Sequence, residues 1–258
     1  MSQIDAAAEQ PFPALAIFTD FDGTLVELAE TPDAVEVPAS LPEQIERTIR
    51  EFGSAFAVIT GRQISDIDHF LAPLHLPIAG GHGTQRRRAD GTLENVDHQT
   101  MAEASEIAAL LAPLVQAHPE LLMEAKESAV ALHYRQAPEL KGRVLAAMEA
   151  ALVQIPHFTL VHGKMVFEAR PTGISKGTAL RAFMQEEPFR GRTPVFIGDD
   201  RTDEDGFIAA QELGGIGIKL GDGDTAARMR IADVPSVHAL LQGLGDLAAR
   251  DRQVEPFH

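Results

Sequence analysis

The 258-residue sequence contains no cysteine, no tryptophan and one tyrosine. Without cysteine, a disulfide scaffold, a cysteine-ligated zinc finger, an iron–sulfur cluster and thiol catalysis are all excluded. The lack of cysteine is also typical of a reducing compartment, so we expect a cytoplasmic location. Apart from 13 phenylalanines, few aromatic side chains are present to stack on a ligand.

Positive charge and long hydrophobic runs are also scarce. The 22 Lys and Arg residues stand against 38 Asp and Glu, for a formal net charge of −16. That excess would repel a phosphate polymer, so we expect no nucleic-acid partner. The longest clearly apolar run, Ile107 to Ala117, falls well short of the ~20 residues that span a bilayer, so we expect no membrane partner. Met1–Gln10 has neither a basic residue nor an apolar block, and we expect no secretory signal there.

The outer parts of the chain alternate between short apolar runs and segments with helical periodicity. This alternation predicts a mostly parallel sheet covered by helices on both faces, that is, an α/β fold. The expected strands are 14–19, 55–59, 76–79, 194–197 and 215–220, and the expected helices are 41–52, 64–70, 175–183 and 203–210.

The middle of the chain has a different pattern. A hairpin is expected over 86–96 around Ala89-Asp90-Gly91. It is followed by two long helices and two pairs of strands, at 101–117, 121–126, 129–135, 140–155, 158–162 and 165–170. Hairpins in place of crossovers predict a separate α+β layer. We therefore expect a core of residues 1–84 and 172–258 with an inserted α+β domain of residues 85–171.

Two carboxylates follow the first expected strand, in Asp20-Phe21-Asp22-Gly23-Thr24. Residues i and i+2 of an extended chain point the same way, so Asp20 and Asp22 face one site while Phe21 faces the core. Such a pair attracts a hard divalent cation such as Mg²⁺, or divides the roles of nucleophile and acid. A surface turn or a calcium loop is the plainer alternative, although no glutamate follows at EF-hand spacing.

Three further motifs follow later elements. Thr60-Gly61-Arg62 offers a hydroxyl and a glycine N–H as a phosphate clasp; alone, it is more simply a helix N-cap. Ser175-Lys176-Gly177 places a cation in a first helical turn, which calls for an anion unless the lysine is solvated. Gly198–Glu204 crowds acids that repel one another without a cation. Together the four motifs lie at predicted carboxyl ends of parallel strands or at the starts of the following helices, and they supply the groups for phosphoryl transfer through an aspartyl-phosphate.

These motifs, in this order, resemble the haloacid dehalogenase (HAD) superfamily of phosphohydrolases. Thr60 and Lys176 lie 116 residues apart (176 − 60), far more than one crossover needs, and the excess resembles the cap of the C2B type that this superfamily inserts there. FTDFDGTLVEL at 18–28, LHYR at 132–135 and GDDRTDEDGF at 198–207 resemble the trehalose-6-phosphate phosphatase family. The resemblance implies a HAD-like, Rossmann-like parallel-sheet core with an inserted α+β cap.

The resemblance also implies a Mg²⁺-dependent phosphatase that hydrolyses trehalose 6-phosphate, the last step of trehalose biosynthesis. Asp20 is then the nucleophile and Asp22 the acid and later the base, with Thr60 and Lys176 completing the catalytic set. Mg²⁺ is then held by the side chains of Asp20 and Asp199 and by the backbone carbonyl of Asp22. Asp200 and Asp203 contact these metal ligands and not the metal itself. The implied substrate contacts are Asp20, Phe21, Asp22, Thr60, Gly61, Arg62 and Lys176 in the core and Glu124, Lys126, Arg135 and Glu168 in the cap.

Other functions stay open at this point. The same chemistry could act on sucrose phosphate or a hexose phosphate. A non-hydrolytic phospho-acceptor module also uses clustered acids, a threonine and a lysine, but needs only about half this length and no insert. Among neighbouring residues, we expect Arg86-Arg87-Arg88 to be a solvated charge run, His133 to pack, and His82 at most to line the site.

Overall fold

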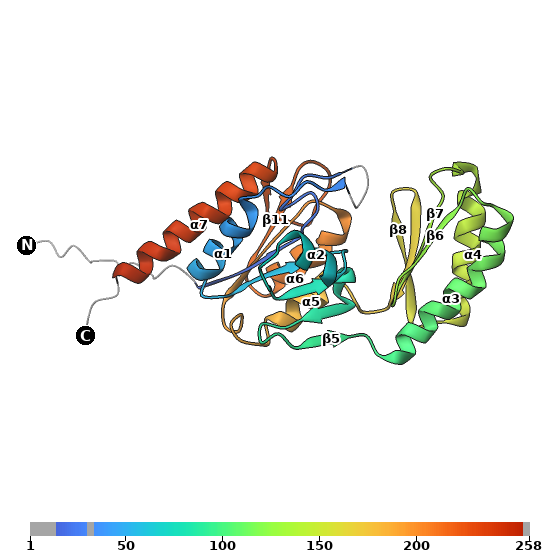
Figure 1. Cartoon of the computed structure of the whole chain (residues 1–258), viewed down its shortest axis with the longest axis horizontal. Helices are drawn as coiled ribbons and strands as arrows, with labels where there is room; N and C mark the ends of the chain where they lie inside the picture. Colours follow the sequence, from blue (N-terminus) through green and yellow to red (C-terminus); the bar gives the residue numbers. More distant parts are fainter. Residues whose placement is uncertain (1–13, 30–33, 255–258) are drawn as a thin grey trace, which may run out of the picture. The chain divides into compact units, whose positions relative to one another are not determined.

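The computed structural model describes residues 14–29 and 34–254, with side chains described as far as residue 247. Met1–Gln10, where no secretory signal is expected, lies outside these residues. The chain divides into two compact units (Figure 1): unit 1 runs to Leu93 and resumes at Ser175, and unit 2 is Glu94–Ile174. Among the described residues, no helix has the length and apolar character needed to cross a membrane.

Unit 1 is built on an eight-stranded sheet of order β12-β11-β10-β1-β2-β3-β4-β5. The strands from β12 to β3 are parallel, and β4 runs antiparallel to β3. The strands are β1 (Leu15–Thr19), β2 (Phe56–Ile59), β3 (Ile78–Gly80), β4 (Gln85–Arg87), β5 (Leu93–Asn95), β10 (Thr193–Gly198), β11 (Ile216–Leu220) and β12 (Met229–Ile231). The α/β class with a mostly parallel sheet is confirmed.

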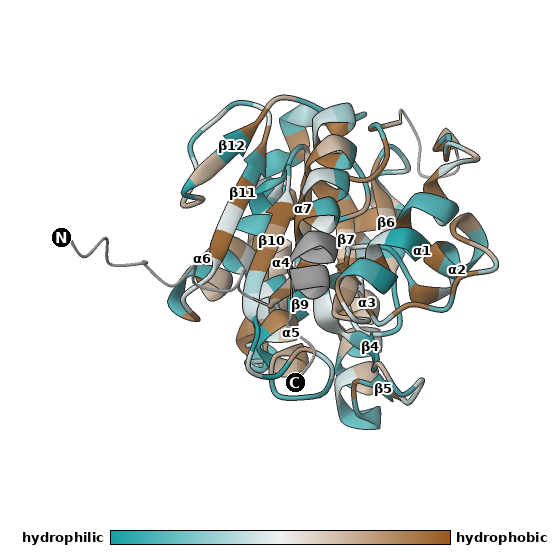
Figure 2. Cartoon of the chain, turned by 90° about the vertical axis from the view of Figure 1, so that its left-hand side faces the viewer, coloured by the Kyte–Doolittle hydropathy of each residue, from teal (hydrophilic) through white to brown (hydrophobic). Residues whose placement is uncertain are grey.

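Successive apolar side chains of β1 point to opposite faces of this sheet, and helices cover both faces. Ile17 belongs to the core shared with α1 (Leu41–Glu51), α2 (Ile64–Phe70) and α7 (Val234–Val254). Phe18 belongs to the opposite core, shared with α5 (Lys176–Phe183) and α6 (Glu204–Glu212). Figure 2 shows hydrophobic residues concentrated in β10 and β11 and hydrophilic residues on α1.

Strand β12 and helix α7 have no counterpart among the expected elements. β12 has only three residues, too few for a period-two pattern to be visible. α7 contains Pro235, Gly243 and Gly245, residue types with poor helix propensity. It is held by tertiary packing, because Val237 and Leu241 lie in the same apolar core as Leu41 and Ile45 of α1.

The hairpin expected at the start of the insert extends the large sheet. β4 is hydrogen-bonded to β3, so unit 1 continues to Leu93, beyond the expected boundary at residue 84. The prediction that Arg86, Arg87 and Arg88 form a solvated charge run is wrong. Arg87 makes a bidentate pair with Asp68 at 2.6 and 2.7 Å, and Arg88 and Arg86 lie 2.6 and 3.5 Å from Glu186. These pairs attach the hairpin to α2 and to the segment after α5.

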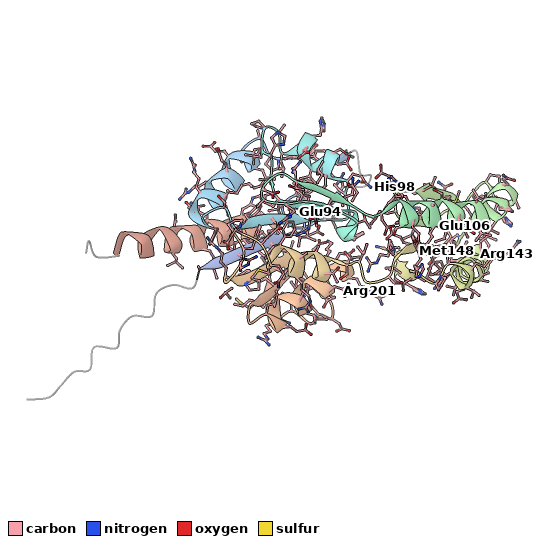
Figure 3. The ribbon with its side chains drawn as sticks, turned by 90° about the horizontal axis from the view of Figure 1, so that it is seen from below. Glu94, His98, Glu106, Arg143, Met148 and Arg201 are labelled. Atoms are coloured by element: carbon pink, nitrogen blue, oxygen red, sulfur yellow. The ribbon has the colours of Figure 1, made fainter. Side chains whose placement is uncertain are left out.

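Unit 2 contains a four-stranded antiparallel sheet of order β6-β7-β9-β8. Its elements are β6 (Leu122–Ala125), β7 (Val130–His133), β8 (Phe158–Gly163), β9 (Val166–Pro171), α3 (His98–Ala117) and α4 (Lys141–Gln154). Figure 3 labels Glu106 on α3 and Arg143 and Met148 on α4. Met148 is fully buried with Val130 and Leu132 of β7, so the helices cover one face of the sheet. The α+β character predicted for the insert is confirmed.

Candidate active site

The core motifs follow three adjacent parallel strands. Thr19 at the end of β1 is paired with Val58 of β2 on one side and Ile197 of β10 on the other. Asp20, Thr60 and Asp199 therefore follow at the same edge of the sheet, where open α/β sheets carry their sites.

A buried ion-pair chain links this edge to helix α5. Lys176 Nζ lies 2.8 Å from Asp20 Oδ2 and 2.7 Å from Asp203 Oδ1, and all three side chains are buried. The alternative of a solvated lysine is therefore wrong. Burial raises the pKa of Asp20 to about 8, with Lys176 opposing and Asp203 adding to the rise. Burial by itself lowers the pKa of Lys176, but the carboxylates of Asp20 and Asp203 outweigh it and raise that pKa above its ordinary value.

Asp203 organises the loop after β10. Its Oδ2 accepts hydrogen bonds from the N–H groups of Asp199 (3.0 Å) and Asp200 (2.9 Å). The Asp199 carboxylate accepts a 3.3 Å bond from Thr24 Oγ1, and burial, with Asp203 and Asp200, raises its pKa to about 6. The buried Lys219 donates to the backbone carbonyl of Asp199. Sequence reasoning missed Lys219, although a lysine interrupting the apolar run of β11 was a usable signal.

Asp200 lies differently from Asp203. Its side chain is exposed and accepts a 2.6 Å bond from the N–H of Arg201, as the cap of the short helix η4 (Arg201–Asp203). Arg201 is itself exposed on this loop (Figure 3). Asp200 thus contributes its backbone N–H to the arrangement, whereas Asp203 contributes its carboxylate.

Three carboxylates converge closely enough to bind one cation. Oxygens of Asp20, Asp199 and Asp203 lie within 4.8 Å of one another. Asp203 already accepts three hydrogen bonds, which leaves Asp20 and Asp199 as the better ligands. Gly23 makes the approach possible, because it has φ +70° and a Cβ there would lie 2.3 Å from the Asp199 carboxylate. An all-oxygen acidic set, with Asp20 and Asp203 buried and Asp199 partly buried, fits a hard divalent cation and not a surface turn.

The Asp22 carboxylate does not join this cluster. Arg62 binds it through two bonds, Nε to Oδ2 at 2.6 Å and Nη2 to Oδ1 at 2.8 Å. The guanidinium carbon lies 5.0 Å from the centre of the Phe70 ring, which holds Arg62 in place. Asp20 and Asp22 therefore do not share one cation through their side chains, and the metal contact expected from the Asp22 backbone carbonyl stays a prediction. The Phe21 side chain is fully buried, so only its backbone can reach a ligand.

The loop of Thr60, Gly61 and Arg62 is not a plain helix cap. The N-cap of α2 is Gln63, in a capping box with Asp66. Thr60 is buried and its Oγ1 accepts a 3.2 Å bond from the N–H of Arg62. The loop is thus a tight turn after β2, placed beside the carboxylate cluster by the parallel sheet.

In unit 2, polar side chains gather on the sheet face opposite the helices. Lys126 Nζ lies 3.1 Å from Glu168 Oε1 and 3.9 Å from Glu124 Oε1. His133, expected to pack, lies 3.4 Å from Glu124. Glu124 and Glu168 are in register across β6, β7 and β9. The structure therefore brings together three of the four predicted sugar contacts, whereas Arg135 is exposed beyond the end of β7.

Comparison with known proteins gives consistent matches. The model of the trehalose-phosphatase family matches residues 18–235. The trehalose-6-phosphate phosphatase of Escherichia coli (strain K12) is 41% identical over 227 residues, covering 88% of this chain and 85% of that protein. A solved structure of a trehalose-6-phosphate phosphatase related protein has a TM-score of 0.73 at 28% identity and covers 92% of this chain and 99% of that one. A HAD-superfamily phosphatase from Bacteroides thetaiotaomicron shares the fold, with a TM-score of 0.60 at 15% identity, covering 96% of this chain and 99% of that one.

Proposed function

The chain belongs to the trehalose-phosphatase family, and on that premise we propose that it is a Mg²⁺-dependent phosphatase that hydrolyses trehalose 6-phosphate to trehalose and inorganic phosphate. The reaction passes through an aspartyl-phosphate, the acyl phosphate formed on the Asp20 carboxylate. The observation that carries this proposal is the buried chain Asp20–Lys176–Asp203, whose carboxylates lie with Asp199 within 4.8 Å.

Asp20 is the nucleophile. Its Oδ1 accepts a 2.7 Å bond from the N–H of Phe21 and its Oδ2 faces Lys176, so the carboxylate is held in one orientation. An oxygen of Asp20 bonds to phosphorus as the bond from phosphorus to the sugar oxygen breaks. Asp20 and Asp199 would hold Mg²⁺, which would favour the ionised carboxylate of Asp20 and offset the charge of the phosphoryl oxygens. Lys176, with Thr60 and Gly61, holds those oxygens.

Asp22 transfers the protons. In the first step its carboxyl group donates a proton to the departing sugar oxygen. In the second step its carboxylate takes a proton from the water that attacks the phosphorus of the Asp20 aspartyl-phosphate, which releases phosphate and regenerates Asp20. A protonated Asp22 cannot keep both bonds to Arg62, so the pair opens during the cycle, and Arg62 then turns to the substrate.

Unit 2 recognises the disaccharide. Glu124, Lys126, Arg135 and Glu168 are charged groups that can each make paired bonds to sugar hydroxyls, and Lys126 orients both glutamates in the free protein. We assign unit 2, Glu94–Ile174, the role of the cap that the sequence predicts over residues 85–171. The cytoplasmic location expected from the composition stays a prediction.

The test is phosphate release from trehalose 6-phosphate with Mg²⁺ and with EDTA. Release should require the metal and should be abolished by Asp20→Asn, whereas Asp90→Asn, the same change at an exposed turn, should leave it intact. Full activity in excess EDTA would refute the proposal. A higher kcat/KM for sucrose phosphate or glucose 6-phosphate would reassign the substrate, and a stable phosphoprotein without turnover would favour the phospho-acceptor alternative.

A further inference from the structure

A strained residue lies beside the loop that we assign to the phosphoryl group. His82 has φ +58° and ψ 22°, between Gly81 at φ +54° and Gly83 at φ +112°. Left-handed backbone costs free energy for any residue with a Cβ, whereas glycine adopts it freely. Strain of this kind persists where the surrounding structure enforces it, and it concentrates at functional sites.

Backbone hydrogen bonds join this turn to the loop. The N–H of His82 donates to the carbonyl of Thr60, and the N–H of Gly81 donates to the carbonyl of Arg62, both at 2.8 Å. The left-handed conformation of Gly81, whose φ and ψ set the angle between these two N–H groups, allows both of them to bind carbonyls on either side of Gly61.

The His82 ring occupies the space that a side chain at position 61 would take. A Cβ on Gly61 would lie 2.6 Å from Cε1 and 2.7 Å from Nε2 of the ring. Contacts under 3.0 Å force a shift, and here the atoms that would move are the end of the His82 side chain. A Cβ at position 61 and the His82 ring in its present place therefore exclude each other. The ring thus closes over the peptide that presents the Gly61 N–H, a group with no hydrogen-bond acceptor elsewhere in the described part of the chain.

We propose that His82 is a positioning residue for the phosphoryl site: its ring, held over Gly61 by a left-handed backbone, fixes the N–H of Gly61 and the loop of Thr60 to Arg62 in the orientation that receives phosphoryl oxygens. This inference rests on the proposed function, because it takes that loop as the phosphoryl site. It gives a role to the side chain at a left-handed position that glycine would occupy without strain.

The experiment compares His82→Gly with Ser54→Gly. Ser54 is the matched control, because it is also left-handed, at φ +67°, but is exposed after α1 and away from the loop. Three quantities are measured for each: the melting temperature, the Ki for inorganic phosphate, and kcat and KM for trehalose 6-phosphate. His82→Gly should raise the Ki and lower kcat/KM by at least about tenfold, since small misplacements of binding groups cost up to ~100-fold. Its melting temperature should stay within about 2 °C of wild type. Ser54→Gly should change none of the kinetic constants.

A second pair of variants tests the contact itself. Gly61→Ala should lower the melting temperature in the wild-type background, because the new Cβ meets the ring, and should lower it less in the His82→Gly background, where that space is open. His82→Asn keeps a side chain that tolerates left-handed backbone but lacks the ring edge. It should show the same rise in Ki, and it supplies the kinetic test if His82→Gly does not fold.

The outcomes are distinct. A wild-type protein that releases no phosphate refutes the proposed function itself. An active wild type with an unchanged Ki and kcat/KM in His82→Gly, or in His82→Asn, overturns the role of His82. A large loss of melting temperature with an unchanged Ki overturns it too, because the ring would then only fill space. Additive effects of Gly61→Ala and His82→Gly on the melting temperature would show that the two positions are not coupled, which overturns the inference.

Discussion

Asp203→Asn should destabilise unit 1 more than any change at its surface. The Asp203 side chain is fully buried and accepts one bond from Lys176 and two from backbone N–H groups. An asparagine can offer its oxygen to the two N–H groups, but its NH₂ group then faces the ammonium of Lys176. That leaves the buried lysine with Asp20 as its remaining acidic neighbour.

The expected loss is about 3–5 kcal/mol, the cost of removing one partner of a buried ion pair. Asp203→Ala should cost more, since each buried N–H left without an acceptor adds about 1–3 kcal/mol. Against a total stability of about 5–15 kcal/mol, the asparagine variant should still fold and the alanine variant should be marginal. kcat should also fall, by ~10–100-fold, because Asp203 orients Asp199, one of the metal ligands that we propose.

Urea unfolding followed by far-UV circular dichroism at pH 7 in EDTA measures this loss. Asp224→Asn, at an exposed position of unit 1, is the control and should stay within about 0.5 kcal/mol of wild type. Tyr134 is the single tyrosine and lies in the core of unit 2, so its fluorescence follows that unit separately. An unfolding free energy for Asp203→Asn within about 1 kcal/mol of wild type would refute the reasoning, because the buried chain would then contribute nothing net.

Two further outcomes follow from the site and from unit 2. In EDTA, the free energy of unfolding should fall as the pH rises from 5 to 8, because the pKa of Asp20 is raised from 3.8 to about 8 and the folded state holds a proton that the unfolded state has lost. Asp20→Asn should reduce this dependence of the unfolding free energy on pH, as measured by urea unfolding at pH 5 and at pH 8. An unchanged pH dependence in that variant would contradict the assignment to Asp20. Lys126→Met should lower kcat/KM for trehalose 6-phosphate by ~10–100-fold, the cost of a charged hydrogen bond, and spare p-nitrophenyl phosphate. Equal losses on both substrates would rule out recognition of the sugar by Lys126.

Much of the fold follows from local pattern alone. Apolar runs of four to six residues that end at a polar residue are strands buried on both faces, and β1, β2 and β10 lie within one or two residues of where that pattern places them. α2 has the predicted bounds, Ile64–Phe70. Since parallel strands all end at one edge, the pattern also implies that the residues after β1, β2 and β10 lie near one another.

The partner of each polar side chain could not be predicted from the local sequence pattern. Period-two alternation assigned Asp20 and Asp22 to one site, yet Asp20 pairs with Lys176, 156 residues away (176 − 20), while Asp22 pairs with Arg62. Both partners are reached through turns and packing that no local pattern encodes.

The amino-acid sequence by itself therefore determined which residues end the strands and which chemistry they offer, because strand periodicity is a local property of the backbone. Only the tertiary structure decided that Asp203 is buried as the acceptor for Lys176, that Lys219 reaches the Asp199 carbonyl, and that His82 closes over Gly61. Those contacts depend on how separate elements pack, and packing selects one arrangement among the many that the same local pattern allows.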